Sequence, residues 1–151
     1  MIFWLLALGV LISDQLTKAA IKSELTLGRT IPIVHDRFHI TYVKNPGGAF
    51  GLMPHGQVFF LLASVTVLII ILAYKVSRKP PGLLINAALA LIFGGTAGNL
   101  LDRLLYGQVI DWLDFRFWPV FNFADTALVV GLALFSLSIM RAHEDGGAGR
   151  E

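Results

Sequence analysis

Four apolar stretches divide the chain, and each approaches the length that crosses a membrane. They cover residues 2–21, 58–74, 83–101 and 122–140. A helix needs about 20 predominantly apolar residues to span the hydrocarbon core of a bilayer. The pattern therefore predicts an all-α membrane protein, built as a bundle of four transmembrane helices.

The connection of about 23–57, between the first and second stretches, has a different period. Apolar and polar side chains alternate along RFHITYVKN (37–45), as they do in a half-buried strand. RTIPIV (29–34) precedes it, and HDR (35–37) suits a turn between two strands. We therefore expect a small hairpin or curved β-sheet in this loop, with one apolar face against the bilayer or over a site.

The composition agrees with a membrane protein and excludes several classes of function. Of the 151 residues, 56% are hydrophobic and 15% are charged, which is too apolar for a soluble domain of this size. We expect one integral membrane domain over residues 1–141 and a disordered polar tail over 142–151. The net charge of +2 gives no support for a nucleic-acid partner. The absence of cysteine excludes disulfides, thiolate metal sites and a cysteine nucleophile.

Basic residues indicate which connections face the cytoplasm. Three of them, with no acid, crowd the short connection 74–82, and Arg141 follows the last span. Short loops rich in lysine and arginine stay on the cytoplasmic side. We therefore expect both termini in the cytoplasm, and connections 23–57 and 102–121, with the sheet, on the extracytoplasmic side.

Two charged residues interrupt the first span. Asp14 and Lys18 are four residues apart, so they share a helix face and can pair. The pair either neutralises itself at the outer end of the helix or faces a functional site. The sequence leaves both interpretations open.

The end of the third span combines small and polar residues. Gly94 and Gly98 allow another helix to approach closely, and packing alone explains them. Packing explains Asn99 less well, because a buried amide needs hydrogen-bond partners. Arg103 lies four residues after Asn99 and shares its helix face, which favours a role at a site. An acid and a base are also common at a membrane interface, so Asp102 and Arg103 could equally be ordinary interfacial charges.

The stretch 108–130 contains the strongest candidates for catalysis. Asp111 and Asp114 lie among aromatic residues that suit the headgroup level, and Asp125 opens the fourth span with Asn122 three residues before it. Each acid alone could be a helix cap or a solvated interfacial charge. Two acids held close together instead share a proton: one acts as a base toward water, and the other donates to the attacked carbonyl. This is aspartic-protease chemistry, and it needs no metal or cofactor.

Other hydrolytic machinery is missing from the sequence. The four histidines form no H-E-x-x-H pair, and no serine lies in a G-x-S-x-G turn. These absences argue against a zinc protease and a serine hydrolase. The histidines are His35, His39, His55 and His143.

Four blocks, in this order, resemble the lipoprotein signal peptidases (signal peptidase II), which are bacterial membrane aspartic proteases. The blocks are DQLTK (14–18), VKNPGGAF (43–50), GGTAGNLLDRLLYGQVIDWLDF (94–115) and FNFADTA (121–127). The resemblance implies a multi-pass protein of the bacterial cytoplasmic (inner) membrane, with its site near the extracytoplasmic face. It implies removal of signal peptides from prolipoproteins, just before a cysteine that carries diacylglycerol. The expected partners are these precursors and membrane lipid, without a cofactor, and we expect a monomer.

The resemblance also implies roles for individual residues. The catalytic aspartates correspond to Asp111 and Asp125, and Asp114 is not the second acid of this dyad. Asparagine amides would bind substrate backbone or steady the carboxylates, and Arg103 would brace the loop that carries Asp111. The residues expected to bind substrate or support the dyad are Asp14, Lys18, Asn45, Asn99, Arg103 and Asn122.

Two other classes of protein remain as alternatives. A small four-span transporter or proton-coupled exporter would use its membrane acids to bind cations. Such a protein is expected to carry an acid deep within a span, whereas Asp111 and Asp125 lie at one end. In a structural membrane subunit, the same acids would be interfacial caps only.

Overall fold

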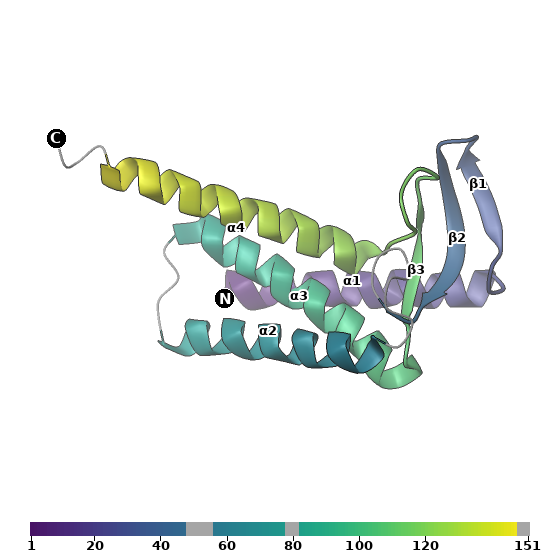
Figure 1. The fold of residues 1–151 in the computed structure, drawn as a ribbon, viewed down its shortest axis with the longest axis horizontal. Helices are drawn as coiled ribbons and strands as arrows, with labels where there is room; N and C mark the ends of the chain where they lie inside the picture. The colour runs from purple at the N-terminus through teal and green to yellow at the C-terminus, as the bar shows by residue number, and fades with distance from the viewer. Residues whose placement is uncertain (48–55, 78–81, 148–151) are drawn as a thin grey trace.

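The structure, a computed structural model, describes residues 1–47, 56–77 and 82–147. In this part of the chain, four helices are long and apolar enough to cross a membrane, and three strands form one sheet. Figure 1 shows the helices running lengthwise and the strands standing across one end of the bundle. The predicted four-span fold with a small sheet is confirmed. The elements are α1 (Ile2–Glu24), β1 (Thr30–Val34), β2 (Phe38–Asn45), α2 (Gln57–Ser77), α3 (Gly82–Tyr106), β3 (Val109–Asp114) and α4 (Phe123–Gly147).

Helix α3 is the centre of the bundle and packs against α1, α2 and α4. Its glycines set how closely the neighbouring helices approach. A Cβ atom at Gly94 would lie 2.6 Å from the carbonyl oxygen of Ala7 on α1, and one at Gly95 would lie 2.5 Å from that of Ala124 on α4. A Cβ atom at Gly98 would likewise lie 2.5 Å from Oδ2 of Asp14 on α1. The predicted packing role of Gly94 and Gly98 thus corresponds to contacts with α1.

The sheet differs from the prediction in the origin of its third strand. The strands are antiparallel in the order β1–β2–β3, and β3 comes from the second outer connection rather than from residues 23–57. Val43 and Asn45 of β2 lie opposite Asp111 and Val109 of β3. Val109, Ile110 and Asp111 are buried in succession, so β3 does not alternate between apolar and polar residues, and the pattern did not reveal it.

Two apolar clusters hold the helices together and attach the sheet to them. One lies between the helices and includes Phe3, Ile71 and Ile92. The other joins Leu25, after the end of α1, to Tyr42 of β2 and Ile110 of β3. The second cluster therefore fixes the position of β3 on the bundle.

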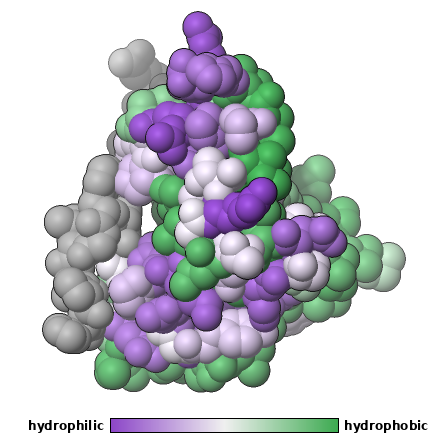
Figure 2. Space-filling model, turned by 90° about the vertical axis from the view of Figure 1, so that its right-hand side faces the viewer, coloured by the Kyte–Doolittle hydropathy of each residue, from purple (hydrophilic) through white to green (hydrophobic). Residues whose placement is uncertain are grey.

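The distribution of side chains agrees with a bundle that spans a membrane. Figure 2 faces the sheet end, where hydrophilic side chains gather across the middle and hydrophobic side chains lie along the margin. Exposed apolar side chains along the helices include Leu62, Ile69, Val129 and Leu132. Such residues suit contact with lipid.

The fourth helix is longer than predicted, and some of the predicted features lie outside the described residues. Helix α4 continues to Gly147, so residues 142–147 are helical where a disordered tail was expected. Once a helix is formed, each further residue adds a hydrogen bond at little cost, and the sequence gives no proline to stop it. The end of the tail (148–151), part of the basic connection (78–81), and the segment 48–55 with His55 lie outside the described residues.

The glycine contacts predict a destabilising substitution with a matched control. Gly95→Ala would push a methyl group into the backbone of α4, so we expect a loss of about 1–3 kcal/mol in the free energy of unfolding. A Cβ added at Gly9 of α1 would meet no atom within 4 Å, so Gly9→Ala should be neutral or stabilise by roughly 0.5–1 kcal/mol. Thermal unfolding in detergent measures both. Equal stabilities of the two variants would contradict the close packing of α3 on α4.

Candidate active site

Buried polar residues gather where the helices meet the sheet. Lys18 is 1% exposed, and Asp14 and Asp102 are fully buried. Buried charges are costly unless they are paired and hydrogen-bonded, so each needs partners here. The other buried polar residues of this cluster are Asn99, Asp111 and Asn122.

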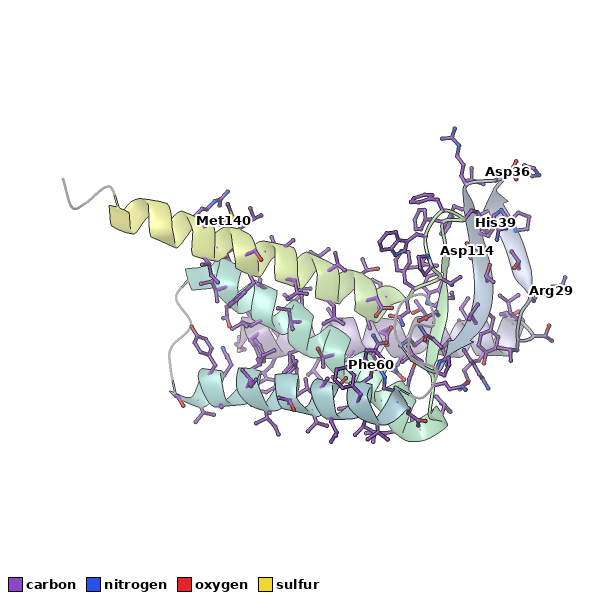
Figure 3. All side chains as sticks on the ribbon, in the orientation of Figure 1. Arg29, Asp36, His39, Phe60, Asp114 and Met140 are labelled. Atoms are coloured by element: carbon purple, nitrogen blue, oxygen red, sulfur yellow. The ribbon has the colours of Figure 1, made fainter. Side chains whose placement is uncertain are left out.

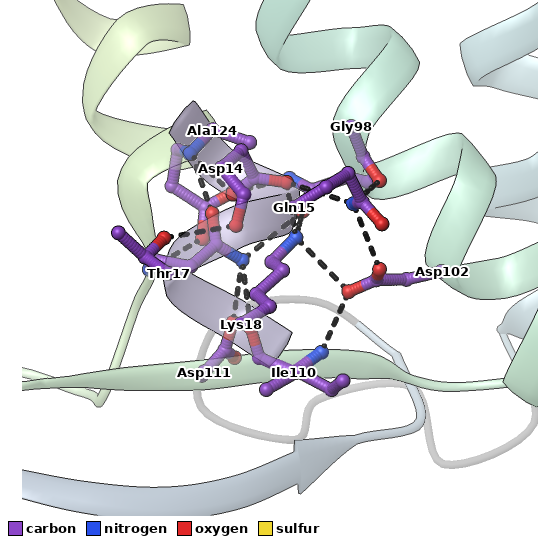
Figure 4. Close-up of polar contacts among 12 residues, drawn as sticks. Asp14, Gln15, Thr17, Lys18, Gly98, Asp102, Ile110, Asp111 and Ala124 are labelled. Carbon is purple, nitrogen blue, oxygen red and sulfur yellow. Dashed lines mark hydrogen bonds and ion pairs between the residues drawn. The ribbon is translucent and has the colours of Figure 1, made fainter. Parts of the chain in front are cut away.

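The ammonium group of Lys18 lies at the centre of the cluster, between α1 and α3 (Figure 4). Its Nζ lies 2.8 Å from Oδ2 of Asp14 and 2.9 Å from Oδ2 of Asp102. It also donates to Oδ1 of Asn99 at 3.1 Å. Three acceptors match the three N–H donors of an ammonium group, so the buried charge is fully partnered. The predicted Asp14–Lys18 pair is present, and it is part of a larger network.

The two carboxylates that hold Lys18 also hold backbone groups of other elements. Asp14 Oδ1 accepts the main-chain N–H of Ala124 in the first turn of α4, at 3.0 Å. Asp102 Oδ2 accepts the main-chain N–H of Ile110 in β3, also at 3.0 Å. These bonds fix the start of α4 and the strand that carries Asp111. The interpretation of Asp102 as an ordinary interfacial charge is therefore wrong.

Asp102 was missed although the sequence contained a signal for it. It lies three residues after Asn99, so it shares that residue's helix face. Gln15 was missed as well: its Nε2 donates to Asp14 Oδ2 at 3.1 Å, to Asp102 Oδ1 at 3.1 Å and to the Gly98 carbonyl at 3.2 Å. An amide beside a membrane acid is a weak signal, because an amide is equally at home facing solvent at the interface.

Two asparagine amides connect Lys18 to Asp111 and Asp125. Asn99 Oδ1 accepts from Lys18, and its Nδ2 donates to Asp125 Oδ1 at 2.7 Å. Asn122 Nδ2 donates to Asn99 Oδ1 at 3.0 Å and to Asp111 Oδ1 at 2.7 Å. Both aspartates are thus held in the same network as the lysine.

Asp125 also caps its own helix. Asn122 Oδ1 accepts the main-chain N–H of Asp125 at 2.8 Å, and Asp125 Oδ2 accepts the main-chain N–H of Asn122 at 3.3 Å. This reciprocal pair is a capping box, and the helix N-terminus stabilises the negative charge. The expectation of a cap is correct, and the same carboxylate also lines the pocket described below.

Asp111 lies on β3 in an environment that favours its protonated form. Asn45 of β2 donates to Asp111 Oδ2 at 2.9 Å, opposite the bond from Asn122. Burial and the nearby charge of Asp125 raise the pKa of Asp111 to about 7, although both amide hydrogen bonds oppose this shift. Asp111 therefore exchanges its proton near neutral pH.

Asp114, three residues along the same strand, is in a different environment. Burial acts to raise its pKa, but hydrogen bonds from the Thr41 hydroxyl and from Arg116 outweigh it and lower the pKa below the ordinary value. Thr41 Oγ1 donates to Asp114 Oδ2 at 2.7 Å, and the Arg116 main-chain N–H donates to Oδ1 at 2.9 Å. Asp114 therefore stays ionised and ties the loop after β3 to the sheet.

A pocket of about 300 Å³ brings the polar residues together with apolar ones. An apolar groove of about 400 Å³ adjoins it along α4 and shares Trp118, Phe121, Asp125 and Val129 with it. The polar pocket is therefore continuous with a surface that suits lipid. Its polar lining residues are Asn45, Asn99, Arg103, Asp111 and Asp125.

Arg103 lines the pocket in an unexpected way. Its guanidinium carbon lies 5.3 Å from the centre of the Phe60 ring on α2. Among the residues that the structure describes, its guanidinium group forms no hydrogen bond or ion pair, so this side chain makes no bracing contact with the strand that carries Asp111. Asp102 makes that bracing contact instead. No described residue accepts from the N–H groups of the Arg103 side chain, so these donors can bind a carbonyl or carboxylate oxygen in the pocket.

The structure thus brings seven of the eight residues expected at the site into one hydrogen-bonded network and places Arg103 on the wall of the same pocket. Two neighbouring carboxylates that share one proton can activate a water molecule and donate a proton to an attacked group. The arrangement can therefore support hydrolysis at the boundary between the polar sheet end and the lipid. The seven are Asp14, Lys18, Asn45, Asn99, Asp111, Asn122 and Asp125.

Known proteins with similar sequences and structures were found over nearly the whole chain. The family model described as Signal peptidase (SPase) II matches residues 6–141. The lipoprotein signal peptidase of Moorella thermoacetica is 44% identical over 149 residues, which cover 99% of this chain and 98% of the relative. That of Pelotomaculum thermopropionicum is 42% identical over 140 residues, covering 93% and 92%. A solved structure titled "Bacterial membrane enzyme structure by the in meso method at 2.3 A resolution" matches with a TM-score of 0.88 at 28% identity, covering 95% of this chain and 90% of that one.

The network predicts that stability depends on Lys18. Lys18→Met would leave Asp14 and Asp102 buried without their cation, so we expect a loss of about 3–5 kcal/mol in the free energy of unfolding. Lys22, one helical turn further along α1, is exposed and lies over the Tyr106 ring, so Lys22→Met should cost less than about 1 kcal/mol. Unfolding in detergent compares the two variants. A Lys18→Met protein as stable as Lys22→Met would show that the lysine does not compensate the acids.

Proposed function

The chain belongs to the signal peptidase II family, and from this premise we propose that it is an aspartic endopeptidase that removes signal peptides from lipoprotein precursors. Family membership supports a membrane protease that acts on prolipoproteins. We infer further that it cuts just before the cysteine that carries diacylglycerol, and that Asp111 and Asp125 are the catalytic pair.

One observation carries this proposal: Asp111 and Asp125 line the same pocket, and amides connect both to the same buried lysine. The pKa of about 7 for Asp111 favours a pair that holds one proton at neutral pH. Neighbouring carboxylates cannot both ionise easily, which gives one of them a proton to donate. The pair thus provides a base and an acid together.

The mechanism uses water as the nucleophile. The ionised carboxylate removes a proton from water as the water oxygen bonds to the scissile carbonyl carbon. The protonated carboxyl group donates its proton to the carbonyl oxygen, which gives a neutral tetrahedral diol. A proton then passes from the dyad to the amide nitrogen as the C–N bond breaks, and a diol hydroxyl returns its proton to the dyad. The products are a free carboxyl end on the signal peptide and a free amine on the cysteine.

The rest of the pocket would bind the substrate. The N–H groups of the Arg103 side chain, which no described residue accepts, suit a carbonyl oxygen near the scissile bond, and Asn45 lies beside Asp111 on the neighbouring strand. The adjoining apolar groove suits a signal helix and its lipid entering sideways from the outer leaflet. The site would then hold the peptide bond where water reaches it from the sheet end.

The orientation in the membrane follows from the same proposal. The sheet and the site would lie at the extracytoplasmic face of the bacterial cytoplasmic membrane. Both termini would lie in the cytoplasm. This agrees with Lys75 in the last turn of α2 and Arg141 at the end of the fourth span, because both basic residues lie at the ends of their helices away from the sheet. We expect the protein to act as a monomer.

The alternatives make different use of the acids. A transporter would be expected to use an acid deep within a span. Asp14 lies within α1, but it is paired with Lys18 and holds the first turn of α4. Asp111 lies on a strand, and Asp125 lies in the first turn of α4. A structural subunit would explain the capping by Asp125. It would not explain Asp111, whose described hydrogen bonds come from side-chain amides rather than from a helix end.

Asp111→Asn and Asp125→Asn should each lower cleavage at least about 10³-fold while the protein remains folded, because each removes one acid of the pair. The assay is incubation of the purified protein in detergent with a diacylglyceryl-modified precursor, and mass spectrometry identifies the cleaved bond. Asp114→Asn is the matched control, from the same strand, and should retain most of the activity. An unmodified precursor tests the requirement for lipid. Normal cleavage by either dyad variant would refute the assignment.

A further inference from the structure

The contact between Phe60 and Arg103 links α2 to the pocket. Phe60 lies near the outer end of α2, where this helix meets α3 (Figure 3), and its ring is half-buried. Arg103 is on α3, four residues after Asn99, and its guanidinium carbon is 5.3 Å from the ring centre. This distance is within the range of a cation–π interaction. As far as the described residues define the pocket, its lining contains no residue of α2.

The guanidinium group lies close to acids with which it does not pair. Asp125, Asp111 and Asp102 are all near enough to attract its charge. A guanidinium beside carboxylates commonly forms a bidentate ion pair, which would use its donors and neutralise the acids. Within the described parts of the chain, Arg103 forms no such pair. Its planar group instead lies over the Phe60 ring, as arginine often does on an aromatic face.

We propose that Phe60 is a positioning residue that acts through Arg103. Its ring holds the guanidinium group on the wall of the pocket, away from Asp111 and Asp125. The arginine donors then remain available for a carbonyl oxygen of the substrate, and the catalytic carboxylates keep the proton that they share. This inference rests on the proposed peptidase function and assigns to it a residue outside the pocket.

The packing of α2 gives this contact a second consequence. α2 packs mainly against α3, and much of its remaining surface is exposed apolar side chains such as Leu62 and Ile69. Toward the other end of the helix, Lys75 Nζ donates to Asn86 Oδ1 of α3 at 2.9 Å. Because Phe60 belongs to α2, the position of α2 on α3 determines where its ring holds the guanidinium group of Arg103. Substrate binding would then depend on a helix that itself contributes no polar group to the described lining of the pocket.

Phe60→Leu keeps an apolar side chain but removes the aromatic face. With the diacylglyceryl-modified precursor, we expect KM to rise roughly threefold to thirtyfold. kcat should stay within about twofold, because the lost contact positions a binding group rather than the dyad. Phe60→Trp should keep KM close to the wild-type value, since tryptophan offers the best face to a cation. Leu62→Ala is the control: Leu62 lies two residues further along α2, is 59% exposed, and its substitution should leave KM unchanged.

Two measurements separate a positioning role from a merely structural one. In an Arg103→Gln background, Phe60→Leu should have little further effect on KM, because the group that it positions is gone. Fluorinated phenylalanines at position 60 keep the shape of the ring and weaken its attraction for a cation, so KM should rise stepwise with fluorine number. This series remains informative even if Phe60→Leu does not fold.

The outcomes distinguish this inference from the proposed function. If the wild-type protein does not cleave the lipid-modified precursor, the peptidase function itself fails. If the wild type cleaves it, but KM stays constant across the fluorinated series, the role of Phe60 is refuted and the peptidase function stands. The double variant gives a second test. If the fold-changes in KM caused by Phe60→Leu and by Arg103→Gln multiply in it, a role exerted through Arg103 is likewise refuted.

Discussion

The buried charge of Lys18 determines how the helices and the sheet are joined at the site. An ammonium group removed from water and lipid headgroups must find acceptors inside the bundle, and it finds Asp14, Asp102 and Asn99. Each carboxylate also binds a backbone group, so that Asp14 fixes the first turn of α4 and Asp102 fixes β3 through the N–H of Ile110. One ion cluster therefore holds together α1, α3, α4 and the sheet, at the end of the molecule where the pocket lies.

Hydrogen bonds connect this cluster to the proposed dyad, Asp111 and Asp125. Asn99 and Asn122 connect Lys18 to Asp125 and Asp111, and the capping box at the start of α4 fixes the direction of the Asp125 carboxylate. The surroundings are dry enough to raise the pKa of Asp111 to about 7, yet the pocket adjoins both the polar sheet end and an apolar groove. A protease of lipid-modified substrates needs both surfaces, because water and lipid must meet at one peptide bond.

Local features of the fold and the site could be predicted from the sequence, and long-range ones could not. The four spans, the Asp14–Lys18 pair and the helix cap at Asp125 follow from residue spacing alone. Strand β3 was missed because its residues do not alternate and its pairing with β2 is long-range, and the burial of Asp102 was missed because an acid near a span end usually reaches water. The resemblance to a known family identified Arg103 as a site residue, but its stacking on α2 depends on how two helices pack.

A carboxyl titration can show whether Asp111 and Asp125 share a proton, as we propose. Carbon-13 NMR of the aspartate carboxyl groups in the detergent-solubilised protein, assigned with Asp111→Asn, would follow Asp111 as the pH changes. We expect a midpoint near pH 7 in the wild type. In Asp125→Asn the midpoint should be lower, because the neighbouring negative charge no longer opposes ionisation, but it should stay above the ordinary value because burial remains. If Asp111 titrates near 3.8 in the wild type, or if Asp125→Asn leaves its titration unchanged, the two carboxylates do not share a proton.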